Sequence, residues 1–495
     1  MENWQNMHMQ PDFSVAQAPR AINFGAKRAI SAMLAAALVY VFFMLFAAVL
    51  AKALVADEIC LAVIHAGGAL ALLIFWRMGH WGRAKYDSFG AALLLMGAAF
   101  RVQALIDALA YGTRMEDIYR YGTVPVTGPD IDLLMKGELI TVLGMLLVAC
   151  SWRLAIGSRI EQYSILLNAK QLPKRLPILV YLAAIGVAVL RVVLKVKFGA
   201  LDQIASLLYS FGVASIYFIA NHQHGSLRKV IISSLLALPM AYLAMGSGMK
   251  EEIFFPFIPA VFIYWRNYRN FGARALAIAL GVAVLSLSQL YVHYVRAETW
   301  RSTDTKLSMS TSDLVSGFEG QLGGATAGDA LDQMSSRINM TIAHATSVTL
   351  ADHHGFEPFN IFGPIPASLI PRMLWTGKPI MQPGAMQTYR ILGGRVPLSQ
   401  IGSATAAGFS TELYLGGWWI GLVLGACVFG SLMAGAQRWS LGFASGFGHQ
   451  SLCFIVMYWT LRFDETHVVY AFTTVIFTVI FILILTKSSK MLGFR

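Results

Sequence analysis

The sequence predicts an all-α integral membrane protein, a polytopic bundle of about 12 transmembrane helices with one large extracytoplasmic loop between spans 9 and 10. Of its 495 residues, 57% are hydrophobic and only 13% are charged. Runs of apolar residues repeatedly approach or exceed the ~20 residues that an α-helix needs to cross a bilayer. A single long polar stretch, residues 297–410, interrupts this series of runs.

Each expected span is bounded by charged residues or by Gly and Pro. The spans are expected at about 30–55, 59–76, 88–111, 131–152, 176–194, 201–220, 230–247, 252–265, 275–295, 411–437, 447–461 and 468–486. The chain therefore divides into a tail (1–29), nine spans (30–295), a loop (296–410), three spans (411–486) and a second tail (487–495). The eighth span is short for a full crossing.

The distribution of Lys and Arg predicts the orientation, because basic loops stay in the cytoplasm. The connections on the side of the two chain ends hold 20 of the 38 basic residues, whereas the opposite short loops hold 9. The bias of about two to one predicts that both termini are cytoplasmic and that the long loop faces outward.

The long loop changes character along its length. Residues 304–328 are rich in Ser, Thr and Gly, whereas residues 330–350 have helical periodicity. Residues 359–375 are apolar but contain Pro364, Pro366 and Pro371. We expect that last part to be a broken or re-entrant segment at the outer interface, which is tolerable where it lines a cavity.

The second half of the loop carries base without acid. Between Pro358 and Thr411 there are Arg372, Lys378, Arg390 and Arg395, and no Asp or Glu. Unpaired guanidinium and ammonium groups beside a lipid surface are what a phosphate-bearing ligand needs. This segment predicts an anion-binding site at the outer face.

A site at the outer face would draw on the outer ends of the spans. Lys250 lies between spans seven and eight, and Arg296 follows span nine. Spans eleven and twelve are joined by a polar connection that contains Arg462, Asp464, Glu465 and His467. Two further charges, Arg101 and Asp107, lie in the outer half of span three. They favour either an ion pair between helices or a role in ligand binding.

Several classes of site are not expected. The sequence has no phosphate-cradling glycine loop, no paired-Cys motif and no Gly-x-Ser-x-Gly elbow, so a nucleotide-sugar donor is not expected. The neighbouring histidines lack the spacing of a metal site, so neither a metal nor a cofactor is predicted. The net charge of +12 is interpreted as topological signal and contact with anionic membrane lipids, and no nucleic-acid partner is expected.

Three local motifs resemble those of bacterial oligosaccharide repeat-unit polymerases, the Wzy-type enzymes of O-antigen and exopolysaccharide synthesis. Residues 246–250 (Gly-Ser-Gly-Met-Lys) resemble the Gly-Ser-Lys turn of that family, although the second Gly and the Met depart from it. Residues 371–379 are similar to its proline-arginine-tryptophan-lysine-proline run. Residues 412–417 with Gly421 resemble its Glu-x-Tyr and glycine pattern. The resemblance covers about residues 240–425.

This resemblance implies a glycosyltransferase of the bacterial inner membrane. It would join polyprenyl-pyrophosphate-linked repeat units on the outer face, with a chain-length regulator and a flippase as further partners. Attack on the anomeric carbon expels a pyrophosphate, which preorganised cations must stabilise. The resemblance assigns the catalytic roles to Arg372 and Glu412, with Glu412 as the base. The residues expected to bind pyrophosphate are Lys378, Arg296, Arg337, Arg395, Lys250 and Arg462. The reserve bases are Asp464, Glu465 and His467.

Other interpretations stay open. Arg372 beside Trp375 is also typical of an interfacial anchor, and Glu412 would favour a helix N-terminus through the dipole. A ligase that transfers the same donor to another acceptor is an alternative enzyme. A transporter or flippase of an anionic lipid-linked sugar would use the same basic groove to bind its substrate.

Overall fold

The computed structural model describes residues 18–53, 56–79, 81–86, 88–111, 131–163, 175–192, 202–245, 253–268, 341–370, 383–391, 407–443 and 446–491, with the single positions 272, 276 and 375. Throughout these ranges the regular elements are helices, so the all-α prediction is confirmed for the part of the chain described.

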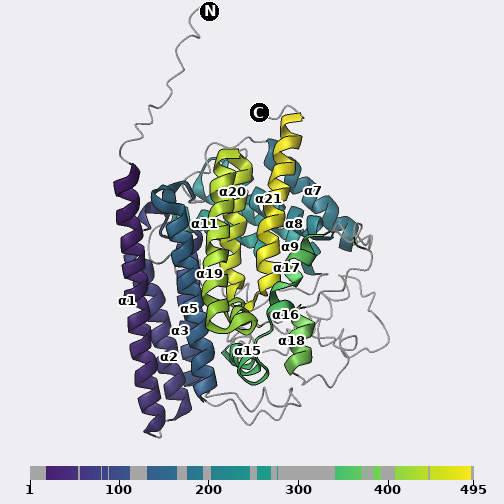
Figure 1. The fold of residues 1–495 in the computed structure, drawn as a ribbon. Helices are drawn as coiled ribbons and strands as arrows, with labels where there is room; N and C mark the ends of the chain where they lie inside the picture. The colour runs from purple at the N-terminus through teal and green to yellow at the C-terminus, as the bar shows by residue number, and fades with distance from the viewer. Residues whose placement is uncertain are drawn as a thin grey trace, which may run out of the picture.

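The N-terminal part is a bundle of long helices. Its members are α1 (Ala18–Lys52), α2 (Asp57–Met78), α3 (Phe89–Tyr111) and α5 (Ile131–Ile156). Consecutive helices pack side by side and alternate in direction (Figure 1). The start of α1 and the end of α21 (Val468–Met491) lie at the same end of the molecule, which we call the termini end (Figure 1).

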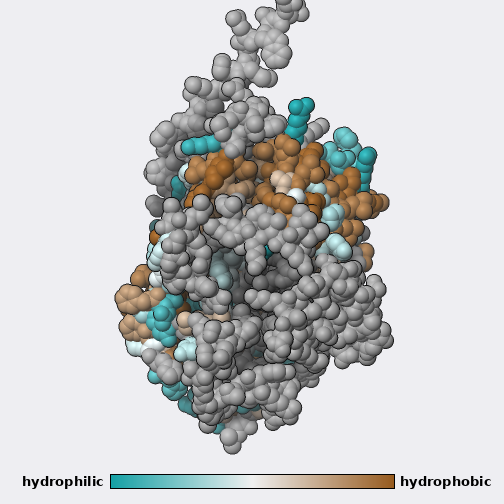
Figure 2. Space-filling model, turned by 90° about the vertical axis from the view of Figure 1, so that its right-hand side faces the viewer, coloured by the Kyte–Doolittle hydropathy of each residue, from teal (hydrophilic) through white to brown (hydrophobic). Residues whose placement is uncertain are grey.

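Seven helices of the described chain are long and apolar enough to cross a membrane. They are Ala26–Lys52, Asp57–Met78, Phe89–Leu109, Ile131–Ile156, Ser226–Met245, Phe409–Leu441 and Val468–Lys487. The chain is therefore a multi-pass membrane protein. Hydrophobic side chains gather in a band toward the termini end, with hydrophilic side chains at its rim (Figure 2).

Further helices occupy several of the remaining expected spans. They are α7 (Arg175–Val192), α8 (Asp202–Asn221), η6 (Phe255–Phe257) with α11 (Ile258–Asn267), and α20 (Gly446–Tyr458). Helix α9 (Ser226–Met245) packs against α7, α8 and α11. The expected ninth span, 275–295, lies outside the described residues apart from position 276. The total of twelve spans stays a prediction.

The helix at the expected tenth span, 411–437, is not straight. Helix α19 (Phe409–Phe443) is broken at Gly417 and Trp418, whose backbone angles leave the helical region. The rings of Phe409 and Phe429 lie 4.6 Å apart, whereas 20 residues of continuous helix would separate them by about 30 Å. The short arm 409–416 therefore folds back along the long arm 418–443.

Glycines allow the two arms of α19 to approach. Leu413 of the short arm lies against Gly421 and Gly425 of the long arm, where an added Cβ would overlap it. The reversal itself requires Trp418 to adopt a positive φ of 51°. Small residues permit this close contact between helices in a membrane, where dispersion forces favour tight packing.

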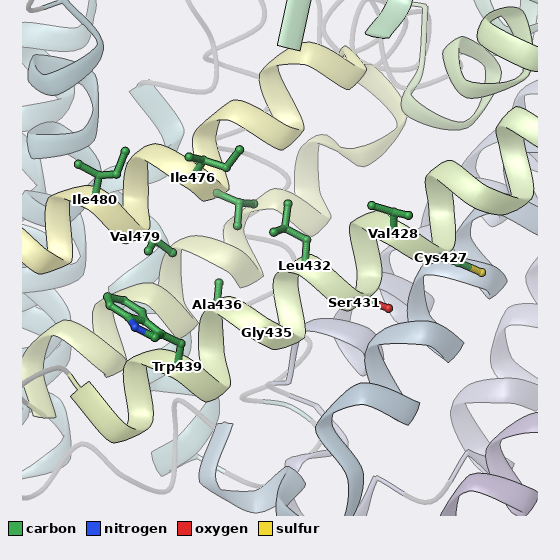
Figure 3. A pocket seen from close by; sticks show the side chains of 11 residues that line it. Cys427, Val428, Ser431, Leu432, Gly435, Ala436, Trp439, Ile476, Val479 and Ile480 are labelled. Carbon is green, nitrogen blue, oxygen red and sulfur yellow. The ribbon is translucent and has the colours of Figure 1, made fainter. Parts of the chain in front are cut away.

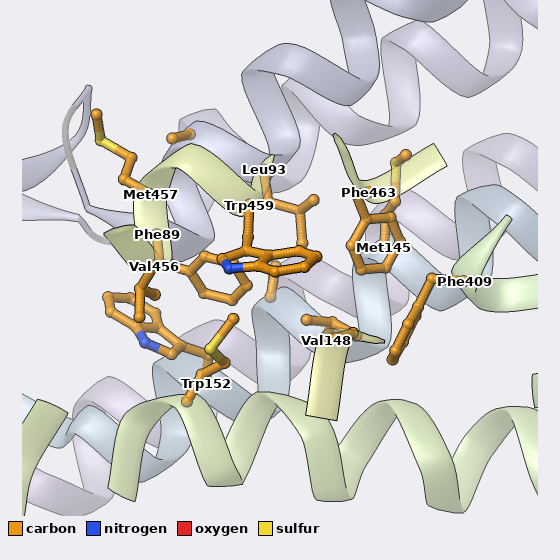
Figure 4. Close-up of a cluster of buried hydrophobic side chains, with 14 of the residues drawn as sticks. Phe89, Leu93, Met145, Val148, Trp152, Phe409, Val456, Met457, Trp459 and Phe463 are labelled. Carbon is orange, nitrogen blue, oxygen red and sulfur yellow. The ribbon is translucent and has the colours of Figure 1, made fainter. Parts of the chain in front are cut away.

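An aromatic core surrounds the base of this hairpin (Figure 4). Phe409 contacts Phe429, Phe463 and Phe472, with ring centroids 4.6–6.3 Å apart. The buried indole of Trp152 stacks on Trp81 at 6.2 Å. The Phe409 contacts join α19 to η8 (Trp459–Glu465) and α21, and Trp152 also contacts Phe89, which joins α5 to α3.

The described part of the long loop is helical. It comprises α15 (Thr341–His354), α16 (Pro358–Phe362), α17 (Pro364–Leu369) and α18 (Pro383–Ile391). The expected broken segment is represented by α16 and α17, each of which begins at a Pro. Helix α15 packs against α5 and α19, away from the termini end (Figure 1).

Candidate active site

A buried carboxylate–histidine pair joins the short arm of α19 to the start of α21. Glu412 Oε1 lies 2.5 Å from His467 Nδ1, and Glu412 Oε2 accepts a hydrogen bond from the backbone N–H of Val468 at 2.6 Å. Both side chains are buried, with relative exposures of 3% and 7%. Two residues 55 positions apart are thus brought into direct contact.

The start of α21 gives a physical reason for a carboxylate at position 412. Val468 is the first residue of α21, and its N–H has no acceptor inside its own helix. Glu412 satisfies this donor, and its charge is favoured by the positive end of the α21 dipole. The predicted preference of Glu412 for a helix N-terminus therefore applies to two helices, the arm that carries Glu412 and α21.

The pair has the chemistry of an oriented base. When Glu412 is ionised, its oxygens can only accept hydrogen bonds, so Nδ1 of His467 must donate. Nε2 is then left with a lone pair, and within the described chain it takes no hydrogen bond. A histidine whose tautomer is fixed by a carboxylate in this way can act as a general base.

A charged cluster lies beside the pair. Arg101 on α3 is the common partner of two carboxylates: its Nε lies 2.9 Å from Glu138 of α5, and its Nη2 lies 3.0 Å from Asp464 of η8. All three side chains are at most 4% exposed. The ion-pair interpretation of Arg101 is therefore the one that the geometry supports, with both its carboxylate partners outside α3.

Two histidines complete the cluster. His65 Nδ1 is 3.6 Å from Glu138, and His344 Nδ1 is 3.8 Å from the same carboxylate. His344 Nδ1 also lies 3.2 Å from Thr141 Oγ1. Its Nε2 lies 3.2 Å from the carbonyl of Asp464, which can only accept, so Nε2 carries a proton.

His344 touches both segments that supply the carboxylate–histidine pair. Gly408, which precedes the short arm of α19, lies against the His344 ring, and a Cβ there would sit 2.6 Å from it. Glu412 donates its N–H to the Gly408 carbonyl at 3.0 Å. Asp464, the other neighbour of His344, is three residues before His467. The loop helix α15 thereby fixes the spacing of the two site residues.

The structure brings three of the predicted site residues together: Glu412, Asp464 and His467. Asp464 is held by Arg101, so His467 is better placed than Asp464 to act with Glu412. The backbones of Arg462 and Glu465 lie in η8, but their side chains are outside the description. The remaining predicted residues also lie outside the described residues: Lys250, Arg296, Arg337, Arg372, Lys378 and Arg395.

Sequence reasoning missed three members of the cluster. Glu138, His65 and His344 were not predicted, although Glu138 and His65 stand inside long apolar runs where an ionisable residue is expensive. That cost was a usable signal for both residues. His344 offered none, because a histidine in a polar loop is unremarkable until the fold places it against α5.

A second polar contact marks the tip of the α19 hairpin. Lys136 Nζ lies 2.5 Å from Asp352, whose other oxygen accepts a hydrogen bond from the Tyr414 hydroxyl at 3.0 Å. The Trp418 indole N–H donates to the carbonyl of Ala351 at 3.4 Å. These contacts tie the tip to α5 and α15 and hold Trp418 in its strained conformation.

An apolar groove of about 740 Å³ runs between α19 and α21 (Figure 3). It extends along α19 from Cys427 to Trp439 and along α21 from Val475 to Ile480. No group of three or more His, Cys, Asp or Glu residues in the described chain is arranged to hold a metal ion. Helices α19 and α21 thus line the groove and also carry the carboxylate–histidine pair at one end.

A family model described as a domain of unknown function (DUF8712) matches residues 153–492. The chain belongs to this family. The DUF8712 region begins near the end of α5 and includes His344, Glu412, Asp464 and His467, whereas Arg101 and Glu138 precede it. No curated protein and no solved structure matches the sequence.

Proposed function

We propose that this DUF8712 protein is a glycan polymerase that joins polyprenyl-pyrophosphate-linked oligosaccharide repeat units at the outer face of a bacterial inner membrane. The observation that carries the proposal is the buried Glu412–His467 pair, at 2.5 Å, inside a multi-pass membrane protein. A base held within the membrane-embedded part of the protein suits a substrate that is itself anchored in the lipid.

The reaction follows from the roles of these groups. The acceptor hydroxyl attacks the anomeric carbon of the donor, and its proton passes to Nε2 of His467. A new glycosidic C–O bond forms while the C–O bond to the pyrophosphate breaks, and the pyrophosphate leaves with the electron pair. Glu412 keeps Nδ1–H donating and stabilises the imidazolium that results.

The developing charge on the pyrophosphate needs cations. The acid-free segment of the loop supplies Arg372 and Lys378 in the motif that resembles the polymerases, and a guanidinium can contact a phosphate through two hydrogen bonds. Loss of one such donor is expected to lower the rate about 10²–10³-fold. These residues extend the site proposed around Glu412 and His467.

The proposal assigns the base to His467 and its orientation to Glu412, whereas the sequence favoured Glu412 as the base. The exchange Glu412→Gln tests this assignment. An amide would donate to Nδ1 and force the proton onto Nε2, which removes the acceptor that the reaction needs. The corresponding exchange in a Ser-His-Asp triad lowers kcat about 10⁴-fold, and a loss of about 10³–10⁴-fold is expected here.

The experiment compares Glu412→Gln, His467→Gln and Arg372→Ala in cells that lack the native gene, at matched membrane abundance. The expected result is short surface polysaccharide with single lipid-linked repeats accumulating on the outer face. Glu357→Gln changes a carboxylate outside the pair and serves as the control. Accumulation on the cytoplasmic face would support a flippase instead, loss of transfer to a final acceptor with normal polymer length would support a ligase, and unchanged long chains would refute the proposed site.

A further inference from the structure

The groove between the long arm of α19 and α21 stays open beside Gly435. On the long arm of α19, an added Cβ would overlap neighbouring atoms at Gly421, Gly425 and Gly430. At Gly435 the same Cβ would meet nothing within 4 Å. Small residues usually let membrane helices pack closely, yet the missing side chain of Gly435 leaves an unfilled space beside α21.

The lining of the groove determines what can fill it. Its walls are almost entirely hydrocarbon, from residues such as Val428, Leu432, Ile476 and Ile480. Water is disfavoured there, because a buried water needs two to four polar partners. The groove is also continuous with the exposed apolar stripe of α19, in which Leu424 is 61% and Val428 56% exposed. A hydrocarbon chain is the occupant that matches this surface.

The length of the groove matches one leaflet. From Cys427 to Trp439 the helix rises about 18 Å, and half of the hydrocarbon core of a bilayer is about 15 Å thick. The Trp439 end of the groove lies toward the termini end, where indoles commonly lie at the headgroup level. A lipid acyl chain would therefore enter the groove from the leaflet at the termini end and extend toward the membrane centre.

Basic side chains stand where the headgroup of such a lipid would lie. Lys487 is seven residues beyond Ile480, so it continues the same face of α21 about 10 Å further toward the termini end. Its side chain is exposed, as is that of Arg438 beside Trp439. One guanidinium nitrogen of Arg438 donates to the Ala155 carbonyl at the end of α5 at 2.9 Å, and a guanidinium has further N–H groups that can meet a phosphate. Basic residues at this depth between transmembrane helices attract anionic phospholipid headgroups.

We propose that this groove is a binding site for one anionic phospholipid of the termini-end leaflet, with an acyl chain in the groove and its phosphate beside Lys487 and Arg438. The site is separate from the Glu412–His467 pair and does not depend on the proposed glycan chemistry. A lipid seated there would fill the space that Gly435 leaves between the long arm of α19 and α21, and so hold the two helices in register.

The test uses the full-length protein in nanodiscs of phosphatidylcholine with a small fraction of phosphatidylglycerol that carries a photoreactive acyl chain. Cross-links are expected in the peptides of α19 and α21 that line the groove. Gly435→Leu fills the space and is expected to reduce these cross-links at least about tenfold. Leu424→Phe adds bulk to the exposed stripe outside the groove and is expected to leave them unchanged.

The headgroup is tested separately. Lys487→Gln is expected to lower the preference for phosphatidylglycerol over phosphatidylcholine about fivefold, which corresponds to about 1 kcal/mol per basic residue near an anionic surface. Lys52→Gln makes the same charge change at the far end of α1 and is expected to have no effect. Because Lys487 is exposed, this variant should fold normally even if Gly435→Leu does not.

Three results would overturn the proposal. A cross-link yield that stays the same in Gly435→Leu and in Lys487→Gln would mean that the groove holds no lipid of this kind. An equal yield with phosphatidylcholine and phosphatidylglycerol probes would remove the role of the basic residues. Displacement of the probe by a polyprenyl phosphate but not by unlabelled phosphatidylglycerol would assign the groove to an isoprenoid chain.

Discussion

Replacing Arg101 with Met should destabilise the protein strongly, because Arg101 is the one cation of the described chain that contacts both Glu138 and Asp464. The two contacts, at 2.9 and 3.0 Å, are each worth about 5.5 kcal/mol of Coulomb attraction at an effective dielectric constant near 20. Much of that attraction is offset by the cost of removing three charges from water. Met retains the length and apolar volume of the arginine stem but leaves two buried carboxylates without their cation.

Loss of one partner from a buried ionic group typically costs about 3–5 kcal/mol, and this is the expected decrease in the free energy of unfolding for Arg101→Met. The assay is reversible unfolding in mixed micelles with increasing denaturing detergent. Lys136→Met is the matched control, since Lys136 and Asp352 are each about 30% exposed and such a pair contributes at most about 1 kcal/mol.

A second variant separates lost attraction from general disruption. Arg101→Met combined with Glu138→Gln and Asp464→Asn removes the buried charges together, and it should recover more than half of the lost stability. Equal stability of Arg101→Met and Lys136→Met would refute the reasoning. It would mean that the two carboxylates are neutral or are solvated in the folded protein.

Three further changes test the geometry around the pair. Gly408→Ala should lower the free energy of unfolding by on the order of 1–3 kcal/mol from backbone strain alone, because Gly408 has φ +83°. Gly408 also faces the His344 ring, so a neutral effect in a denaturing-detergent titration would argue against this close approach. His344→Phe should cost about 1–3 kcal/mol, because the Asp464 carbonyl loses its donor, and should lower transfer activity; normal activity would remove its positioning role. Trp418→Gly should be about 1–2 kcal/mol more stable than Trp418→Ala, because both variants lose the indole but only Gly accepts the positive φ without strain. Equal stabilities of the two variants in the same titration would contradict the reversal at the hairpin tip.

The apolar runs of the sequence predicted where most of the helices lie. Runs such as 59–76 and 131–152 correspond to α2 and α5, because a segment of that length and apolarity is stable only as a helix in lipid. The same topology placed Glu412, Asp464 and His467 at one end of the bundle. Local composition was sufficient for these predictions, since each depends on the transfer of one segment into the membrane.

The reversal inside α19 could not be predicted from apolarity. A straight helix and a folded-back hairpin bury residues 409–443 equally well in a hydrocarbon environment, so hydropathy does not separate them. Gly416 and Gly417 were a local signal for a turn, but they also resembled the glycine pattern that opens a span in the polymerase family. Close packing of Leu413 against Gly421 and Gly425 decides the outcome, and it depends on shape.

The sequence by itself determined a multi-pass α-helical membrane protein and predicted that Glu412 and His467 lie at the same side of the membrane, at the ends of different spans. Only the tertiary structure decided that these two side chains meet, that Arg101 binds Glu138 and Asp464, and that His344 lies between Glu138 and the Asp464 carbonyl. The reason is the range of the forces. Transfer into lipid acts on each segment separately, whereas ion pairs and packing act over a few ångströms between residues that only the folded chain brings together.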